Sequence, residues 1–291
     1  MPFKRSNGSK RAHQMACRAC DEPVLSLSKH PVESVMRTEE AIFIVLAGLV
    51  VGSFLNVCIH RLPKGESLVR PASRCPVCSV PIRWYDNIPV ISFLLLGGRC
   101  RGCGGRISWL YPAVEALTGM LFLLTMLRFG LGVRTIFLLA FLCGLVVVTF
   151  IDLDHQIIPH AVTLPGILLG LIASFITGDP SPRDAAAGAL VGAGLVYLVA
   201  VYAEVAFQRE SMGGGDINLL AMIGAFLGWR QVLLSFFLAV GAGACLSLLL
   251  IATGVLSRKD RIPFGPFLAL GAVVALFGGD DLINWYWQLL R

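Results

Sequence analysis

Two aspartates stand at the polar boundaries of long apolar segments, where a carboxylate is costly. Asp152 closes one apolar run, and Asp216 follows three glycines and opens a short one. Ionisable groups at membrane depth are rare and by default indicate function. If carboxylates from two helices meet, their repulsion lets them share one proton, which provides one acid and one base at the same pH. The pattern therefore predicts a catalytic aspartate pair, in which the charged member activates water and the protonated member polarises a scissile carbonyl.

An alternative interpretation stays open for these residues. Asp152 and Asp154 could be helix-end charges at a membrane surface, and Gly213–Gly215 could be a plain loop, because Gly-x-Gly-Asp is a short motif. In the functional interpretation the glycines have a steric role, since residues without Cβ let the backbone approach a neighbouring helix or an extended substrate.

Two Cys-x-x-Cys pairs form the second candidate site, Cys75/Cys78 and Cys100/Cys103, with 21 residues between the pairs. Each pair presents two thiolates to one tetrahedral ion, and the separation is just beyond the usual spacing of a Cys₄ zinc site. A structural ion would also stabilise a segment too small for a large core. The four cysteines are predicted zinc ligands, and a redox dithiol is the alternative.

Other polar and sulfur-bearing residues give weaker signals. Glu115 falls inside an apolar segment and should have a partner there, functional or structural, whereas Glu204 lies near a segment end where it can reach water. His155 and His160 are interpreted as polar loop residues. The remaining cysteines receive no site role: Cys17, Cys20, Cys58, Cys143 and Cys245.

The composition indicates which elements must position these residues. Of the 291 residues, 56% are hydrophobic and only 14% are charged, against about 25% charged in soluble domains. This excludes a soluble globular enzyme, a disordered tail and a fibrous repeat. A spanning helix needs roughly 20 mainly apolar residues. Eight candidate segments are present: 41–59, 110–127, 135–151, 161–177, 185–207, 217–228, 232–256 and 264–279. The segment 217–228 is the weakest because it is short.

The distribution of basic residues predicts the topology. The polar interval 60–109 holds eight Lys or Arg against two acidic residues, so the positive-inside rule makes it cytoplasmic. The loops then predicted inside carry twelve Lys or Arg, and the outside loops with the C-terminal tail carry five. Both aspartates fall at cytoplasmic helix ends. The net charge of +6 is thereby explained by loops facing the cytoplasm, and no nucleic-acid partner is expected.

The predicted fold class is all-α: a polytopic membrane helix bundle of about eight transmembrane helices with a small zinc-binding cytoplasmic loop domain. The predicted parts are a disordered N-terminal extension (1–38), a first transmembrane helix (39–60), a cytoplasmic Cys₄ zinc-binding domain (61–109), a transmembrane aspartic peptidase core (110–280) and a C-terminal tail (281–291). The extension has no apolar run and is no signal peptide. Met36 is an alternative start, because a compact pattern begins there.

With these residues identified, the chain resembles the bacterial type IV prepilin leader peptidases, bifunctional aspartic peptidases and N-methyltransferases. The ordered matches are Gly52–Val57, His60–Pro63, both cysteine pairs with Tyr85–Val90 between them, Tyr111–Glu115, Asp152 with Ile158-Pro159, Thr163–Pro165, Gly213-x-Gly215-Asp216 and Ile262–Pro266. Together these matches cover the chain from about 39 to 280.

The resemblance implies a function for the predicted site. Asp152 and Asp216 would be the catalytic pair, and prepilins or pseudopilins with a basic leader and an apolar helix would be cleaved at the cytoplasmic face of the bacterial inner membrane. The new N-terminal residue would be methylated with S-adenosylmethionine, an activity that rests on the resemblance alone. One departure is His160, where the family usually has aspartate. The alternatives are a peptidase without methyltransferase activity, or a membrane transporter or scaffold with a zinc-bound docking loop, although no related halves typical of transporters are apparent.

Overall fold

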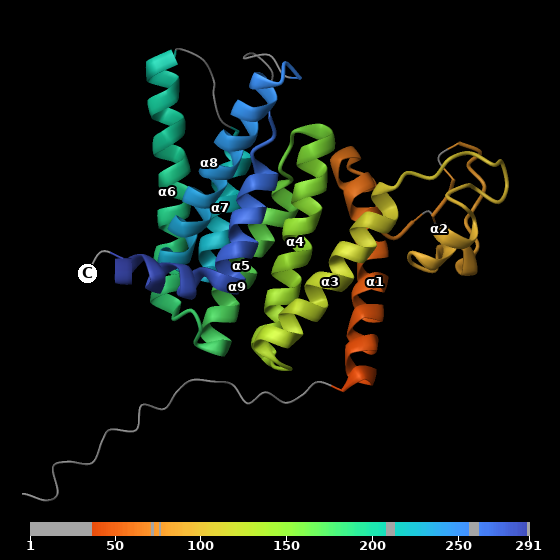
Figure 1. Cartoon of the computed structure of the whole chain (residues 1–291), viewed down its shortest axis with the longest axis horizontal. Coiled ribbons are helices and arrows are strands. Elements are labelled where there is room, and N and C mark those ends of the chain that lie inside the picture. The colour runs from red at the N-terminus through yellow and green to blue at the C-terminus, as the bar shows by residue number, and fades with distance from the viewer. Residues whose placement is uncertain (1–36, 71–72, 76, 208–212, 256–261, 290–291) are drawn as a thin grey trace, which may run out of the picture. The chain divides into compact units, whose positions relative to one another are not determined.

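The computed structural model of the chain describes residues 37–70, 73–75, 77–207, 213–255 and 262–289. These residues form an arrangement of helices joined by loops (Figure 1). The long helices are α1 (Thr38–Arg61), α3 (Leu110–Phe129), α4 (Val133–His155), α5 (His160–Thr177), α6 (Pro182–Phe207), α8 (Trp229–Ala252) and α9 (Gly265–Leu289). Shorter helices are η1 (Leu62–Lys64), η2 (Trp84–Asn87), α2 (Ile91–Leu95) and α7 (Gly214–Leu227). No strand occurs in these described ranges, which confirms the all-α class.

Seven of the helices are long and apolar enough to cross a membrane. The chain is therefore a multi-pass membrane protein. The eighth predicted segment corresponds to α7, whose 14 residues span only about 21 Å, short of the roughly 30 Å hydrocarbon core. Every residue from Leu219 to Phe226 in α7 is buried, as expected for a helix that is apolar all round and enclosed by other helices.

Glycines bring the helices into close contact. A Cβ on Gly188 of α6 would lie 2.3 Å from the carbonyl oxygen of Gly224 in α7, and one on Gly192 would lie 2.4 Å from that of Leu220. On the other side of the bundle, a Cβ on Gly48 of α1 would lie 2.7 Å from Cα of Gly119 in α3. Because small residues permit such approach, two of the closest helix pairs are positioned by glycine.

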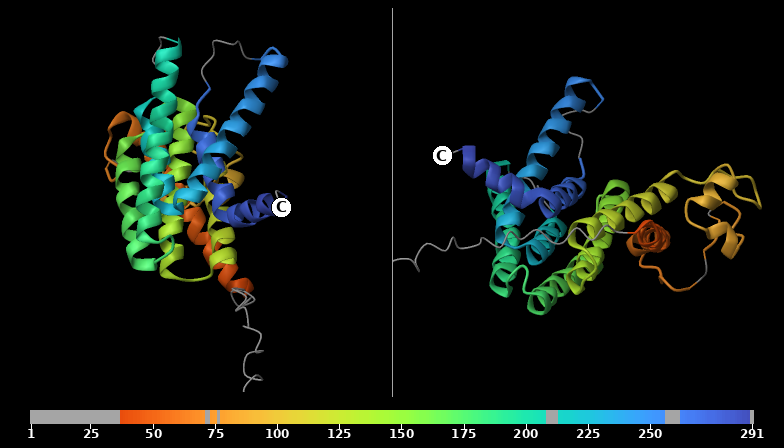
Figure 2. Two further views of the ribbon diagram at one scale, coloured as in Figure 1. Left: turned by 90° about the vertical axis from the view of Figure 1, so that its left-hand side faces the viewer. Right: turned by 60° about the horizontal axis from the view of Figure 1, so that its bottom comes forward.

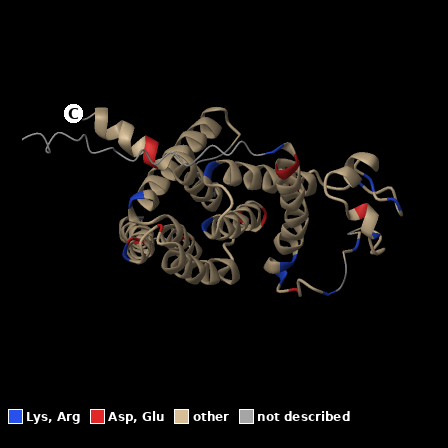
Figure 3. Ribbon diagram, turned by 90° about the horizontal axis from the view of Figure 1, so that it is seen from below, with Lys and Arg blue, Asp and Glu red and all other residues tan. Residues whose placement is uncertain are grey.

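The ends of several helices that carry candidate residues lie on one side of the bundle. In Figure 1 the C-terminal ends of α1 and α4 and the N-terminal ends of α3 and α5 all lie toward the top. The left view of Figure 2 again shows these helices running side by side, and the right view looks nearly along α1. Basic residues are concentrated in the segment between α1 and α3, while the helices are largely free of charge (Figure 3).

The two ends of the chain were predicted as an extension and a tail. The predicted disordered extension falls on residues 1–36, outside the described residues apart from its last two positions. At the other end, α9 continues to Leu289 through residues predicted as a tail, and its final turns bend across the bundle (Figure 1). Trp285, Tyr286 and Trp287 are exposed in these turns. Such aromatic side chains are enriched at membrane–water interfaces, which hydropathy alone does not capture.

Candidate functional site

Asp152 lies in the last turn of α4 and is buried, with 5% of its surface exposed. Its Oδ2 accepts a hydrogen bond of 2.8 Å from the backbone N–H of Gly265, the first residue of α9. The N-terminus of a helix stabilises a carboxylate through its unpaired N–H groups and its dipole. A Cβ at position 265 would lie 2.7 Å from the same oxygen, so a larger residue there would displace the carboxylate.

Asp216 lies in the first turn of α7 and is half-buried. Its carboxylate interacts electrostatically with that of Asp152, so the structure places the two predicted residues in the same region of the bundle. The preceding glycine makes this possible, since a Cβ on Gly215 would lie 2.7 Å from Cβ of the buried Ile158, between α4 and α5. Asp154, in contrast, is exposed.

His160 joins two of the elements around this pair. As the first residue of α5, it accepts a hydrogen bond of 2.9 Å at Nδ1 from the amide of Asn218 in α7. The sequence interpretation of His160 as a polar loop residue missed this link. Gly265 was likewise recognised only as part of a matched motif, because its contact with Asp152 joins residues 113 positions apart.

The four predicted metal ligands form the second cluster. The Sγ atoms of Cys75, Cys78, Cys100 and Cys103 all lie within 4.8 Å of one another, and none of these cysteines forms a disulfide. The Sγ atoms of Cys75 and Cys103 are 3.9 Å apart, close to the roughly 3.8 Å between ligands of a tetrahedral ion with 2.3 Å bonds. The cluster therefore has the donor set and spacing of a structural zinc site.

The two cysteine pairs have the same backbone turn. The carbonyl of Cys75 accepts from the N–H of Ser79, and that of Cys100 accepts from Gly104, each at 2.9 Å. Ser79 and Gly104 both have positive φ. In the first turn, the N–H groups of Cys78 and Val77 lower the pKa of Cys75 to about 6, which favours the thiolate that a metal requires.

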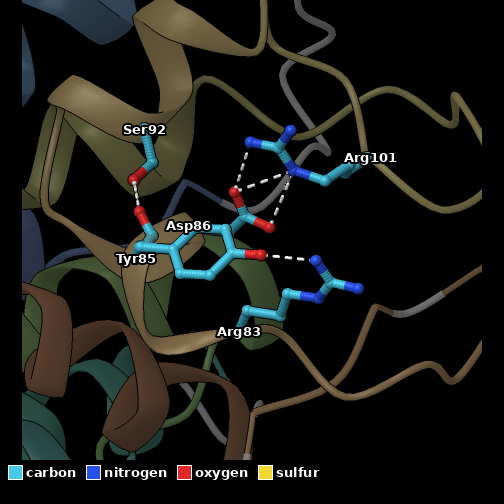
Figure 4. A network of polar contacts seen from close by, with 5 residues as sticks. All are labelled: Arg83, Tyr85, Asp86, Ser92 and Arg101. Atoms are coloured by element: carbon cyan, nitrogen blue, oxygen red, sulfur yellow. Dashed lines mark hydrogen bonds and ion pairs between the residues drawn. The ribbon is translucent and has the colours of Figure 1, made fainter.

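The segment between the pairs is tied to the second turn by a polar network (Figure 4). Arg101 binds the carboxylate of Asp86 through Nε and Nη2, with the shorter contact at 2.8 Å. Arg83 donates to the hydroxyl of Tyr85, whose backbone carbonyl accepts from Ser92 at 2.9 Å. These contacts order the segment 61–109 in addition to any metal.

Glu115 is buried in α3, with 8% of its surface exposed. The sequence left open whether its partner is functional or structural. Glu115 accepts a 2.8 Å hydrogen bond from the backbone N–H of Val90 and interacts with the hydroxyl of Ser53 in α1. Glu204 is exposed, in agreement with its expected access to water. Cys58 is buried, Cys143 is half-buried and Cys245 is exposed, while Cys17 and Cys20 lie outside the described residues.

Comparison with known proteins places the chain in a family. Residues 46–129 match the family described as the bacterial peptidase A24 N-terminal domain, and residues 139–248 match the type IV leader peptidase family. No solved structure matches the chain.

Several relatives are named prepilin leader peptidase/N-methyltransferase. The protein from Myxococcus xanthus is 47% identical over 74% of this chain and 64% of its own length. The protein from Pseudomonas aeruginosa is 36% identical over 90% of this chain and 96% of its own length, and that from Aeromonas hydrophila is 38% identical over 84% and 92%. On these matches, the chain belongs to the type IV leader peptidase family.

Proposed function

We propose that the chain is a membrane aspartic endopeptidase that cleaves the leader from prepilins or pseudopilins and N-methylates the new N-terminal residue. The peptidase activity is supported by the electrostatic interaction between Asp152 of α4 and Asp216 of α7. Asp152 also accepts a hydrogen bond from the backbone N–H of Gly265. The names of the relatives support both activities.

The chemistry needs only two carboxylates and water. The ionised carboxylate accepts a proton from water as the water oxygen attacks the scissile carbonyl carbon, and the protonated carboxylate donates to the carbonyl oxygen. When the tetrahedral intermediate collapses, the C–N bond breaks and the leaving amine takes a proton. Asp152 and Asp216 share this work, and the exposed Asp154 has no part in it.

The proposed substrate has a basic leader before the cleavage site and an apolar helix after it. That helix can stay in lipid while the flanking peptide unwinds at the carboxylates. The excess of basic residues in the segment 60–109 supports a cytoplasmic position for this side of the bundle. The proposed location is therefore the bacterial inner membrane, with the aspartates and the cysteine cluster facing the cytoplasm.

A structural zinc ion is proposed at Cys75, Cys78, Cys100 and Cys103, supported by the tetrahedral spacing of their Sγ atoms. The ion would stabilise the segment 61–109, which has little buried apolar surface of its own. Cys75 and Phe93 are its buried hydrophobic residues among those described. S-adenosylmethionine would supply the transferred methyl group.

The test uses the purified full chain and a purified prepilin, incubated with and without S-adenosylmethionine, with the intact mass of the product as readout. Loss of the leader in both reactions, with one added methyl group only when S-adenosylmethionine is present, is the expected result. An uncleaved prepilin would contradict the peptidase assignment. Cleavage without added methyl mass would leave a peptidase that lacks methyltransferase activity.

A further inference from the structure

A cavity of about 540 Å³ lies between α1, α3 and the segment that carries the cysteines. Its volume falls within the range of about 300–1,000 Å³ typical of small-molecule sites. Neither Asp152 nor Asp216 lines it, so the peptidase chemistry does not account for it. The cavity is therefore a candidate site for a separate ligand.

A buried carboxyl group lies in the wall of the cavity. Glu115 lines it, and none of the ion pairs formed among the described residues involves this carboxylate. A buried charge is costly unless it is paired and hydrogen-bonded. The backbone N–H of Val90 donates a hydrogen bond to Glu115, but no opposite charge is paired with it among the described residues. Glu115 could therefore bind a cationic group of a ligand.

The backbone around Glu115 is specialised for this arrangement. Val90 has φ of 59°, a left-handed conformation that is a genuine outlier for a β-branched residue and is typically found at functional sites. In this conformation its N–H reaches the carboxylate. On the other side, a Cβ on Gly52 of α1 would lie 2.7 Å from Cα of Glu115, so glycine lets α1 pack directly against this turn of α3.

Four arginines of the cysteine-bearing segment also line the cavity: Arg74, Arg83, Arg101 and Arg106. Arg101 is paired with Asp86, which lines the cavity as well, so Arg74 and Arg106 are the guanidinium groups that suit a ligand carboxylate. Apolar side chains, among them Ile82, Phe93 and Ile107, line it too. This lining suits a ligand that carries a cation, a carboxylate and an apolar portion.

S-adenosylmethionine has this combination in its sulfonium, its amino-acid carboxylate and its adenine ring. We propose that the methyl donor binds in this cavity with its sulfonium facing Glu115, an inference that rests on the proposed methyltransferase function. A sulfonium carries charge but no N–H donor. It is therefore suited to a carboxylate that already accepts a hydrogen bond from the backbone N–H of Val90.

His60 lines the cavity and interacts electrostatically with His155, in the last turn of α4, the helix that carries Asp152. Cys75 and Cys100 also line the cavity, so the proposed zinc would support one of its walls.

The test compares two ligands that differ in the charge on sulfur. Binding of S-adenosylmethionine and of S-adenosylhomocysteine, whose thioether is neutral, is measured by calorimetry on the purified full chain and on Glu115→Gln. Removing one partner of a buried charge pair weakens binding strongly, so affinity for the sulfonium should fall about 30-fold or more. Affinity for the thioether should change much less. Glu204→Gln, at an exposed glutamate of α6, is the matched control and should alter neither.

If Glu115→Gln lost affinity for both ligands equally, or for neither, the inference would be overturned, while the proposed methyltransferase activity would stand. No donor binding by the wild-type chain would refute that half of the proposed function as well. A photoreactive adenosyl analogue provides a check on the unsubstituted protein. Cross-links within 53–61 and 80–115 support the site, and cross-links confined to α4–α9 overturn it.

Discussion

Gly265→Ala is expected to slow leader cleavage about ten- to hundredfold. The added Cβ would lie 2.7 Å from Oδ2 and 3.2 Å from Cγ of Asp152, about 0.7 Å inside ordinary contact with the oxygen. The carboxylate must therefore shift and weaken its 2.8 Å hydrogen bond from the N–H at position 265. A hydrogen bond to a charged group contributes about 1.5–3 kcal/mol, and tenfold corresponds to about 1.4 kcal/mol. A misplacement approaching 1 Å has an effect of the same order on rate.

The assay is the initial rate of cleavage of a purified prepilin by enzyme in detergent, resolved on a gel. Gly278→Ala is the matched control, because it adds the same methyl group to α9 where nothing lies within 4 Å. Equal melting temperatures of the two variants would show that any difference in rate arises at the site. Equal rates for Gly265→Ala and Gly278→Ala would refute the role of the α9 N-terminus in holding Asp152.

Two further substitutions test the elements that position the sites. Cys100→Ser should reduce the zinc content, measured by elemental analysis, from about one ion per chain to none, and should make the segment 61–109 sensitive to protease. Cys245→Ser should change neither the zinc content nor the protease sensitivity. Zinc retained by Cys100→Ser would exclude Cys100 as a ligand. Gly188→Ala should lower the melting temperature, because its Cβ would lie 2.3 Å from a carbonyl oxygen of α7 and overpacking costs about 1–3 kcal/mol. Gly194→Ala, with open space on the same helix, should not lower it, and equal melting temperatures would contradict the proposed packing.

Hydropathy predicts most of the helices because a spanning segment must form its backbone hydrogen bonds within itself and present apolar side chains to lipid. The expected segment 161–177 agrees with α5 at His160–Thr177, and the expected 110–127 agrees with α3 at Leu110–Phe129. The final turns of α9 escaped prediction, since Asp280 and Asp281 interrupt the apolar run while the helix continues to Leu289.

The cysteine cluster was predictable because its ligands lie in two local turns, whose spacing is visible in the sequence. The contact between Asp152 and Gly265 was not, because it depends on which helix ends become neighbours. The cavity at Glu115 was not predictable for the same reason, since it needs Ser53, Val90 and Glu115 from three separate elements. The sequence signalled only that Glu115 was an unusual charge inside an apolar segment.

The most direct test of the aspartate pair is the intact mass of a prepilin after incubation with four forms of the full chain: wild type, Asp152→Asn, Asp216→Asn and Asp154→Asn. Asparagine preserves the shape of each side chain but cannot share the proton. Wild type and Asp154→Asn should release the leader, because Asp154 is exposed and outside the pair. Asp152→Asn and Asp216→Asn should leave the prepilin at its full mass while inserting and melting like wild type. Robust cleavage by either of these two variants would contradict the proposed mechanism.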